Sequence, residues 1–157
     1  MQFAFACDGV IPAAPISGVN TLTLSARGGP GPDLIALAAS ATPGRLILAG
    51  AGAFAVATAN VGTGGDVTVS ADTGSAVLPL ALSWCQTDPG SGVCLGPATS
   101  APLPATVGPG ATPTFAVFAS AAGSIPFDPS SNRVFFRVRD LAGQVIGATS
   151  LAVNGEP

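Results

Sequence analysis

The sequence predicts an all-β fold in which two antiparallel sheets pack as a sandwich. Apolar residues alternate with small or polar residues at period two along most of the chain, which is the pattern of half-buried strands. Clusters of Gly, Pro, Asn and Asp interrupt this alternation at short intervals, as turns between strands do. The chain has 157 residues, of which 48% are hydrophobic, so it is long and apolar enough to bury one core. These observations favour a sandwich or a barrel over a helical fold.

The expected strands follow the alternation in chain order. They span residues 19–26, 34–39, 45–49, 53–61, 66–71, 77–86, 105–107, 114–120, 133–140 and 144–153. Residues 33–40 would also suit a short turn of helix, and we favour a strand there. Alternate side chains of a strand point to opposite faces, so each strand is expected to turn one bulky apolar side to the core. The expected core side chains include Phe54, Val56, Val67, Val69, Leu78, Leu80, Leu82, Trp84, Phe115, Val117, Val134, Phe136, Val138, Val145, Leu151 and Val153.

Two glycine-containing segments are expected to form hairpin turns. The segment Asp140-Leu141-Ala142-Gly143 lies between two strong strand patterns, and glycine suits the turn position with a positive backbone φ. The segment Thr63-Gly64-Gly65-Asp66 separates two strand patterns in the same way. We therefore expect each turn to join neighbouring strands of one sheet.

A run of Gly and Pro in residues 27–33 divides the chain into two parts. We interpret residues 1–32 as an N-terminal extension and linker, and residues 33–157 as the sandwich domain. The extension holds one or two strands and cannot fold alone. It is the end of an upstream module, an extra strand on the same sandwich, or a strand offered to another chain. The remaining part has the length and strand number of an immunoglobulin-like sandwich.

The cysteine spacing predicts a disulfide. Cys85 and Cys94 flank a segment, Gln-Thr-Asp-Pro-Gly-Ser-Gly-Val, that has to turn, and a strand returning beside its start brings two Cα atoms within disulfide range. A disulfide between Cys85 and Cys94 indicates an oxidising compartment and hence secretion. The alternative is a pair of small buried cysteines in a reduced protein. Cys7 is left over as a free thiol, an intermolecular partner or half of a pair.

The composition argues against catalysis. The chain has no His, no Lys and no Tyr, and 8% of its residues are charged. Without His or Lys it cannot build a Ser-His-Asp triad, a Cys-His dyad, a Schiff base or a Walker-type phosphate loop. We therefore expect no enzyme, no cofactor and no metal centre, with a calcium site from Asp66, Asp72 or Asp140 as the open alternative. The net charge of −3 argues against nucleic acid as a partner, and the glycines within residues 46–65 argue against a membrane span.

The first candidate interaction surface is a set of arginines. Arg133, Arg137 and Arg139 share one face of the expected strand 133–140. They form either an anion-binding patch for a polysaccharide or another partner, or a solvated face paired with acids such as Asp66 or Asp72. Cross-strand pairs of the second kind are common and weak, so this interpretation is the simpler one.

The second candidate interaction surface is a set of alanines on the expected strand 53–61. Phe54 and Val56 face one way, and the opposite face carries Ala53, Ala55, Ala57 and Ala59. A smooth surface of small side chains would let another β layer or subunit approach closely, since exposed apolar patches usually mark contacts. The alternative is tight packing inside this domain.

Three stretches resemble sequences of bacterial immunoglobulin-like domains in secreted and cell-surface proteins. Phe54-Ala-Val-Ala-Thr-Ala-Asn-Val-Gly62 resembles the N-x-G ending of an early strand. Asn132-Arg-Val-Phe-Phe-Arg-Val-Arg-Asp140 with its following turn resembles the closing hairpin, and the stretch from Cys85 to Cys94 is the third. The resemblance covers roughly residues 33–153. The chain departs from the family in lacking a Tyr near the start of a late strand and in its unpaired Cys7.

The resemblance implies spacers, adhesive modules or assembly units without catalytic residues. We therefore expect a non-catalytic extracellular structural or adhesive module of a bacterial surface protein. The alternative is a self-assembling subunit of an extracellular filament or surface layer, in which residues 2–26 add a strand to a neighbour. The expected partners are proteins, through self-association or neighbouring modules, with polysaccharide as a further candidate.

Overall fold

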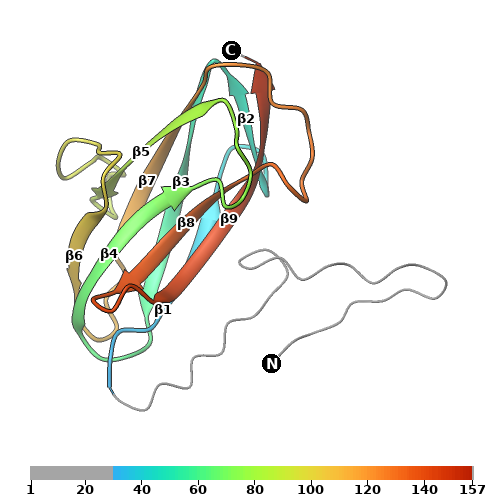
Figure 1. Ribbon diagram of the computed structural model, residues 1–157. Coiled ribbons are helices and arrows are strands. Elements are labelled where there is room, and N and C mark those ends of the chain that lie inside the picture. Colours follow the sequence, from blue (N-terminus) through green and yellow to red (C-terminus); the bar gives the residue numbers. More distant parts are fainter. Residues whose placement is uncertain (1–29, 157) are drawn as a thin grey trace, which may run out of the picture.

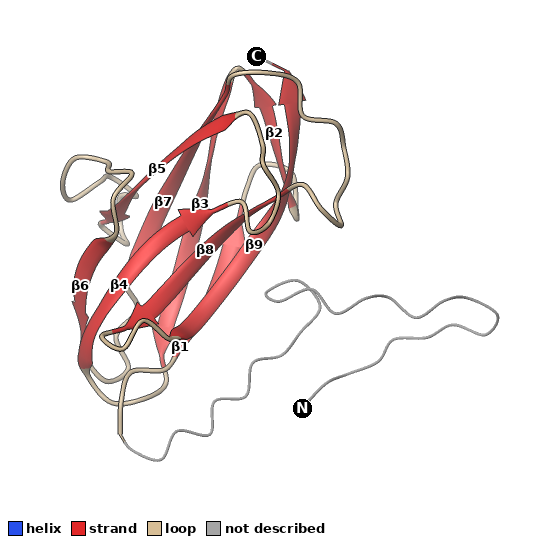
Figure 2. Cartoon of the chain, in the orientation of Figure 1, coloured by secondary structure: helices blue, strands red, loops and turns tan. Residues whose placement is uncertain are grey.

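The computed structural model describes residues 30–156, and the regular structure in this range is β-strand throughout (Figures 1 and 2). The strands are β1 (Leu34–Ala39), β2 (Arg45–Ala49), β3 (Ala51–Asn60), β4 (Gly65–Asp72), β5 (Leu80–Thr87), β6 (Leu103–Val107), β7 (Thr114–Ala121), β8 (Arg133–Asp140) and β9 (Val145–Glu156). The predicted strands 34–39, 45–49 and 133–140 are confirmed with the same bounds, and the other predictions in this range differ only at their ends. The helical alternative for residues 33–40 is wrong, because β1 pairs along its length with β3. The predicted strand 19–26 and Cys7 lie outside the described residues.

The strands form two layers with the core between them. One layer has the order β1-β3-β7-β5 and is antiparallel throughout. The other has the order β2-β9-β8-β4-β6, in which β2 and β9 are parallel. The two layers are joined at one corner, where Ala49 pairs with Ala51 around Gly50. The predicted all-β sandwich is thus confirmed, and the immunoglobulin-like assignment stays a prediction.

The core is filled by the bulky side of each strand. Phe115 and Phe136 come from opposite layers, and their ring centroids lie 5.1 Å apart. Trp84 is also buried, and its Nε1 has no hydrogen-bond partner in the described part of the chain. Fully burying one large apolar side chain stabilises a domain by roughly 1.5–3 kcal/mol. The predicted core position Val145 is wrong, since the register shifts after Val138 and Ile146 is buried in its place.

The first strand of the sandwich is split between the two layers. β1 pairs with β3, and the chain then crosses to the other layer and continues as β2 in the same direction beside β9 (Figure 1). The crossing contains Gly44 at φ 72°, a left-handed conformation that favours glycine. The start of β1 also approaches β9, where a Cβ at Gly147 would lie 2.5 Å from the carbonyl oxygen of Leu34. This side of the sandwich is therefore closed by β1 and β2.

Asn60 ties together three connections at one end of the sandwich. Its side chain is 2% exposed, and its Oδ1 accepts the N–H groups of Asp33 (3.0 Å) and Gly62 (3.1 Å). Its Nδ2 donates to the carbonyl oxygens of Thr63 (2.8 Å) and Gly108 (2.9 Å). The amide is thereby fully hydrogen-bonded, as a buried polar group requires. It holds the entry to β1 and the connections β3–β4 and β6–β7.

The two predicted hairpins have different outcomes. The hairpin at residues 140–143 is confirmed, since Gly143 lies at φ 79° and its N–H donates to the Asp140 carbonyl between β8 and β9. The hairpin at residues 63–66 is wrong, because β3 and β4 belong to different layers. The connection crosses the end of the core there, pinned by Asn60. Turn residues signal a reversal of the chain and do not distinguish a hairpin from such a crossing.

Candidate functional site

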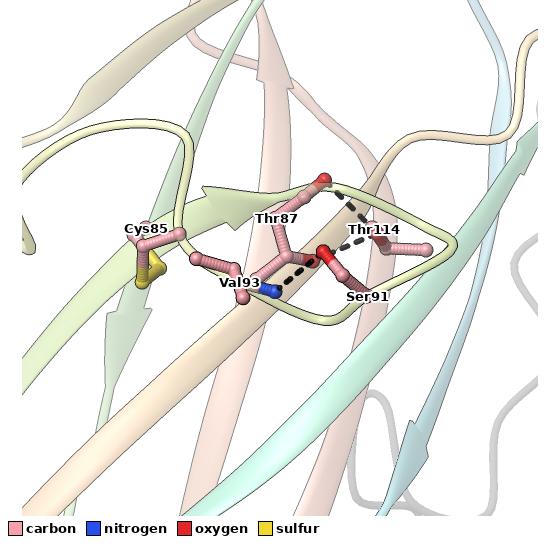
Figure 3. Close-up of a disulfide and its surroundings, with 6 residues drawn as sticks. Cys85, Thr87, Ser91, Val93 and Thr114 are labelled. Carbon is pink, nitrogen blue, oxygen red and sulfur yellow. Dashed lines mark hydrogen bonds between the residues drawn. A yellow bond between two sulfur atoms is a disulfide. The ribbon is translucent and has the colours of Figure 1, made fainter.

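The predicted disulfide between Cys85 and Cys94 is confirmed, with the two Cα atoms 5.7 Å apart. Figure 3 shows it on β5, beside the loop through which the chain turns back. The returning residues 94–99, which we call the return segment, run along the outer edge of β5. Trp84 and Thr99 exchange two backbone hydrogen bonds of 2.9 Å each across this edge. The disulfide therefore fixes a segment that covers an otherwise open strand edge.

Acidic side chains brace the loops. Oδ1 of Asp88 accepts the hydroxyl and the N–H of Ser91, both at 2.8 Å, and the N–H of Gly90 at 3.1 Å. These hydrogen bonds hold the pKa of Asp88 below its usual value of 3.8, and the Ser91 hydroxyl contributes most to this shift. Asp128 has a lowered pKa for the same reason, with Ser130 as its main donor. These carboxylates are committed to local turns.

We call the outer side of β2, β9, β8, β4 and β6 the charged face. All four arginines of the described residues lie on it, together with several acids and hydroxyls. Its outward positions include Arg45, Thr68, Ser70, Asp72, Thr106, Arg133, Arg137, Arg139, Ser150 and Asn154. The three arginines singled out in the sequence are thus neighbours on one strand of this face.

Arg137 is paired within the domain. Its Nε lies 2.7 Å from Oδ2 of Asp72 and its Nη2 lies 3.2 Å from Oδ1, a two-pronged contact. The guanidinium also stacks over the Phe135 ring at 4.6 Å. Partial burial raises the pKa of Asp72, but hydrogen bonds from Arg137 and the Gly74 N–H, with the positive charges of Arg137 and Arg139, lower it below 3.8. The predicted pairing of this face with Asp72 is therefore present.

The other two arginines of β8 also contact the domain. Nε of Arg133 donates to the Ser150 hydroxyl at 3.1 Å, and Nη1 donates to the Pro129 carbonyl at 2.8 Å. Burial lowers the pKa of Arg133 from its usual value, and arginine remains charged at any physiological pH. Nη1 of Arg139 donates to the Gly143 carbonyl at 3.0 Å. An anion-binding patch built from these residues stays a prediction.

We call the outer side of β1, β3, β7 and β5 the neutral face. Its outward positions are Ile35, Leu37, Ala39, Ala51, Ala53, Ala55, Ala57, Ala59, Ala81, Ser83, Cys85, Thr87, Thr114, Ala116, Phe118 and Ser120. Among these positions of the four described strands, none carries a charge. The four alanines of the sequence prediction lie at its centre and point away from the core. Among the described residues, Ala53, Ala55 and Ala57 are exposed and Ala59 is half-buried, and the use of this surface for a contact stays a prediction.

Three large apolar side chains stand out on the neutral face. Leu37 and Ile35 are 68% and 55% exposed at its β1 border, and Phe118 is 37% exposed on β7. A shallow hollow of about 330 Å³ lies near Leu37 and Phe118, lined by Ala39, Ser40, Ala41, Ala53, Phe54, Ala55 and Ala116. These three side chains were not part of either sequence-predicted surface. Leu37 and Phe118 join the alanines only through the cross-strand register, which places Leu37 opposite Ala57 and Phe118 opposite Ala53, and alternation along a single strand does not show that register.

The described residues contain no group of three or more Cys, Asp or Glu side chains placed to hold a metal ion. Asp66, from the calcium alternative, accepts the Thr106 hydroxyl at 2.7 Å, and Asp72 pairs with Arg137. Within the same residues, no helix has the length and apolar character needed to cross a bilayer. No model of a known protein family matches the chain, and no curated protein is significantly similar to it.

Proposed function

We propose that this chain is a non-catalytic structural or adhesive module of an extracellular or cell-surface protein of a bacterium. The observation that carries the proposal is the disulfide between Cys85 and Cys94 in an all-β sandwich. Structural disulfides persist in oxidising surroundings. A closed loop of about ten residues adds roughly 2.5–3 kcal/mol to the free energy of unfolding in the chain-entropy account. This added stability suits a domain that works outside the cell.

The amino-acid composition supports a role without catalysis. The whole sequence lacks His and Lys, the side chains that most often act as general bases or activate nucleophiles. Several acids of the described part are engaged in turns or, in the case of Asp72, in the pair with Arg137. The chemistry that this domain offers is that of its surfaces. Adhesion to an anionic polysaccharide would use Arg133 and Arg139 of the charged face.

A second candidate is a self-assembling subunit that exchanges strands with its neighbours. The observation that favours it is the composition of the edge strand β1, which is apolar throughout, with Ile35 and Leu37 exposed. An apolar edge strand is a template for a strand from another chain, although the start of β1 is already packed against Gly147 of β9. Residues 2–26, which would supply the added strand, lie outside the described residues.

Antibody labelling of intact cells that produce the protein tests the proposal. We expect the antibody to label intact cells or the culture medium as strongly as permeabilised cells. Mass spectrometry of non-reduced peptides should find Cys85 linked to Cys94. Labelling that requires permeabilisation, or two reduced cysteines, contradicts the proposal. Electron microscopy distinguishes the second candidate, since strand exchange predicts filaments from the full chain and none after removal of residues 1–26.

A further inference from the structure

The neutral face can be covered without removing water from a charged group. Its outward positions are alanines, a few larger apolar side chains and small hydroxyls. Covering the charged face would instead desolvate arginines, including Arg133 and Arg139, and desolvating a charge is costly without a matched partner. Exposed apolar patches of this kind mark contact surfaces. The neutral face is therefore the better candidate for burial against another protein.

The sheet edges are less available than the faces. The return segment occupies the outer edge of β5. β6 is a short edge strand that contains Pro104, and proline and shortness both discourage strand addition. The start of β1 is packed against Gly147 of β9. Association through side chains of the neutral face is thus favoured over backbone pairing at these edges.

The shape of the neutral face is complementary to itself. Phe118 is partly exposed on β7, and the hollow lined by Ala39, Ala53, Ala55 and Ala116 lies next to it on the same face. The hollow of about 330 Å³ is shallow and open to solvent, so it can receive the edge of a phenylalanine ring. A twofold axis midway between the two features places each copy's Phe118 in the other copy's hollow. Contacts of this reciprocal type define twofold dimers.

The size of the neutral face fits a weak dimer. Four strands spaced about 4.8 Å apart, each about eight residues long at roughly 3.3 Å per residue, give a face of about 500 Å². Cys85 and Thr87 at its β5 border are already buried in the single chain, so two copies would bury less than about 1,000 Å² in total, which is the size of a weak interface. The alanines would let the two sheets approach closely. These dimensions indicate an association that depends on concentration.

We propose that the neutral face is the interface of a homodimer in which two copies of this chain pack their β1-β3-β7-β5 layers face to face. Phe118 of each copy packs against the hollow of the other, and the alanines of β3 form the flat centre. The inference goes beyond the proposed function, because it depends on the chemistry of one face and holds in any compartment. Its failure would leave the antibody-labelling result unaffected.

Sedimentation velocity of the full chain tests the dimer. The protein is prepared without reductant, and its free thiols are blocked with iodoacetamide so that Cys7 cannot link copies covalently. We expect the average mass to rise from monomer toward dimer as the concentration increases from about 1 to 500 μM. A monomer at every concentration overturns the proposal, including the case in which residues 1–29 or another protein cover the face.

Matched charge substitutions locate the interface. Ala55→Glu places a carboxylate at the centre of the neutral face, and we expect it to weaken dimerisation at least about tenfold. Thr68→Glu places the same carboxylate on the charged face, opposite Arg139, and should leave the dimer unchanged. Mixing Ala55→Glu copies with Ala55→Arg copies should restore dimers. Equal loss in both single variants, or no loss in Ala55→Glu, overturns the proposal.

A second substitution separates loss of the dimer from a folding defect caused by Ala55→Glu. Phe118→Ser removes a ring that is 37% exposed, so we expect the monomer to stay folded with a somewhat lower thermal midpoint while the dimer weakens. Circular dichroism of each variant at low concentration establishes that the monomer is folded. A folded Phe118→Ser variant that dimerises like the parent contradicts the proposed packing.

Discussion

The neutral and charged faces of the sandwich rest on one core and differ in what they present to water. On the charged face, Arg45 donates to Asn154 at 2.6 Å and stacks over Phe127 at 4.1 Å, and Arg137 pairs with Asp72. Its charged groups thus have partners inside the domain. On the neutral face, the alanines of β3 carry no polar group that needs a partner. Packing in the core constrains only every second residue of a strand, the one that points inward. The outward-pointing residues between them are therefore free to differ according to what each face contacts.

Asn60 joins three connections at one end of the sandwich, and its removal should have the largest effect. Asn60→Ala removes four hydrogen bonds to part-buried backbone groups in these connections. Each lost hydrogen bond costs roughly 0.5–1.5 kcal/mol, so we expect urea denaturation to show a loss of about 3 kcal/mol or more. The matched control is Asn154→Ala on the charged face, which should cost less than about 1 kcal/mol. Equal losses would mean that Asn60 does not join the layers.

Removal of the disulfide tests how much the β5 border of the neutral face contributes to stability through this covalent link. Replacing Cys85 and Cys94 together with alanine should lower the free energy of unfolding by roughly 2.5–3 kcal/mol. The cause is the greater freedom of the unfolded chain, together with a loosened return segment. Urea denaturation of the double variant and of the reduced parent protein should agree. A loss below about 1 kcal/mol would show that backbone pairing alone secures the β5 edge.

The ion pair of the charged face should have the smallest effect and a defined pH dependence. The folded pKa of Asp72 lies below its unfolded value near 3.8, so the pair's contribution is present above that pH and is lost as the pH falls through the folded value. Asp72→Asn should cost up to about 1 kcal/mol at pH 7, as for partly exposed pairs. Urea denaturation at a series of pH values from 7 downward should show the difference shrinking as the pH falls below the unfolded value near 3.8.

A neighbouring acid provides the comparison for Asp72. Asp66→Asn removes a carboxylate that accepts the Thr106 hydroxyl on the same face, and it should change stability less. Added salt should also reduce the cost of Asp72→Asn, because ions screen exposed pairs. A cost of Asp72→Asn that is independent of both pH and salt would indicate a packing effect in place of the ion pair.

Local alternation was enough to predict most of the fold. The bounds of β1, β2 and β8 follow from the period-two alternation and from the flanking turn residues. The disulfide between Cys85 and Cys94 followed from the short turning segment between the two cysteines. The crossing at residues 63–66 was not predictable in this way, because its course depends on Asn60 and on Gly62. A Cβ at Gly62 would collide with the carbonyl oxygen of Gly31. Such close approaches depend on residues distant in sequence.

The candidate surfaces were predictable only strand by strand. Ala53 to Ala59 and the arginines of β8 each lie on one strand, so their shared faces followed from alternation. The neutral face as a whole also needs Leu37 and Phe118, which join it through the pairings of β3 with β1 and β7. Pairing partners and register are properties of the folded layers. The alternation along one strand contains no information on pairing or register, and for this reason Leu37 and Phe118 were not predicted as part of the face.

The split first strand determines how the domain would bear mechanical tension. β2 runs parallel to β9, with Arg45 opposite Ala152 and Ala49 opposite Glu156. Pulling on the chain before β2 and after β9 would slide these two strands past each other. In that geometry the evenly spaced hydrogen bonds of a parallel pair are loaded together, whereas an antiparallel hairpin pulled from its open end breaks one bond at a time. As a link in a pulled chain, the domain would yield by shear at β2 and β9.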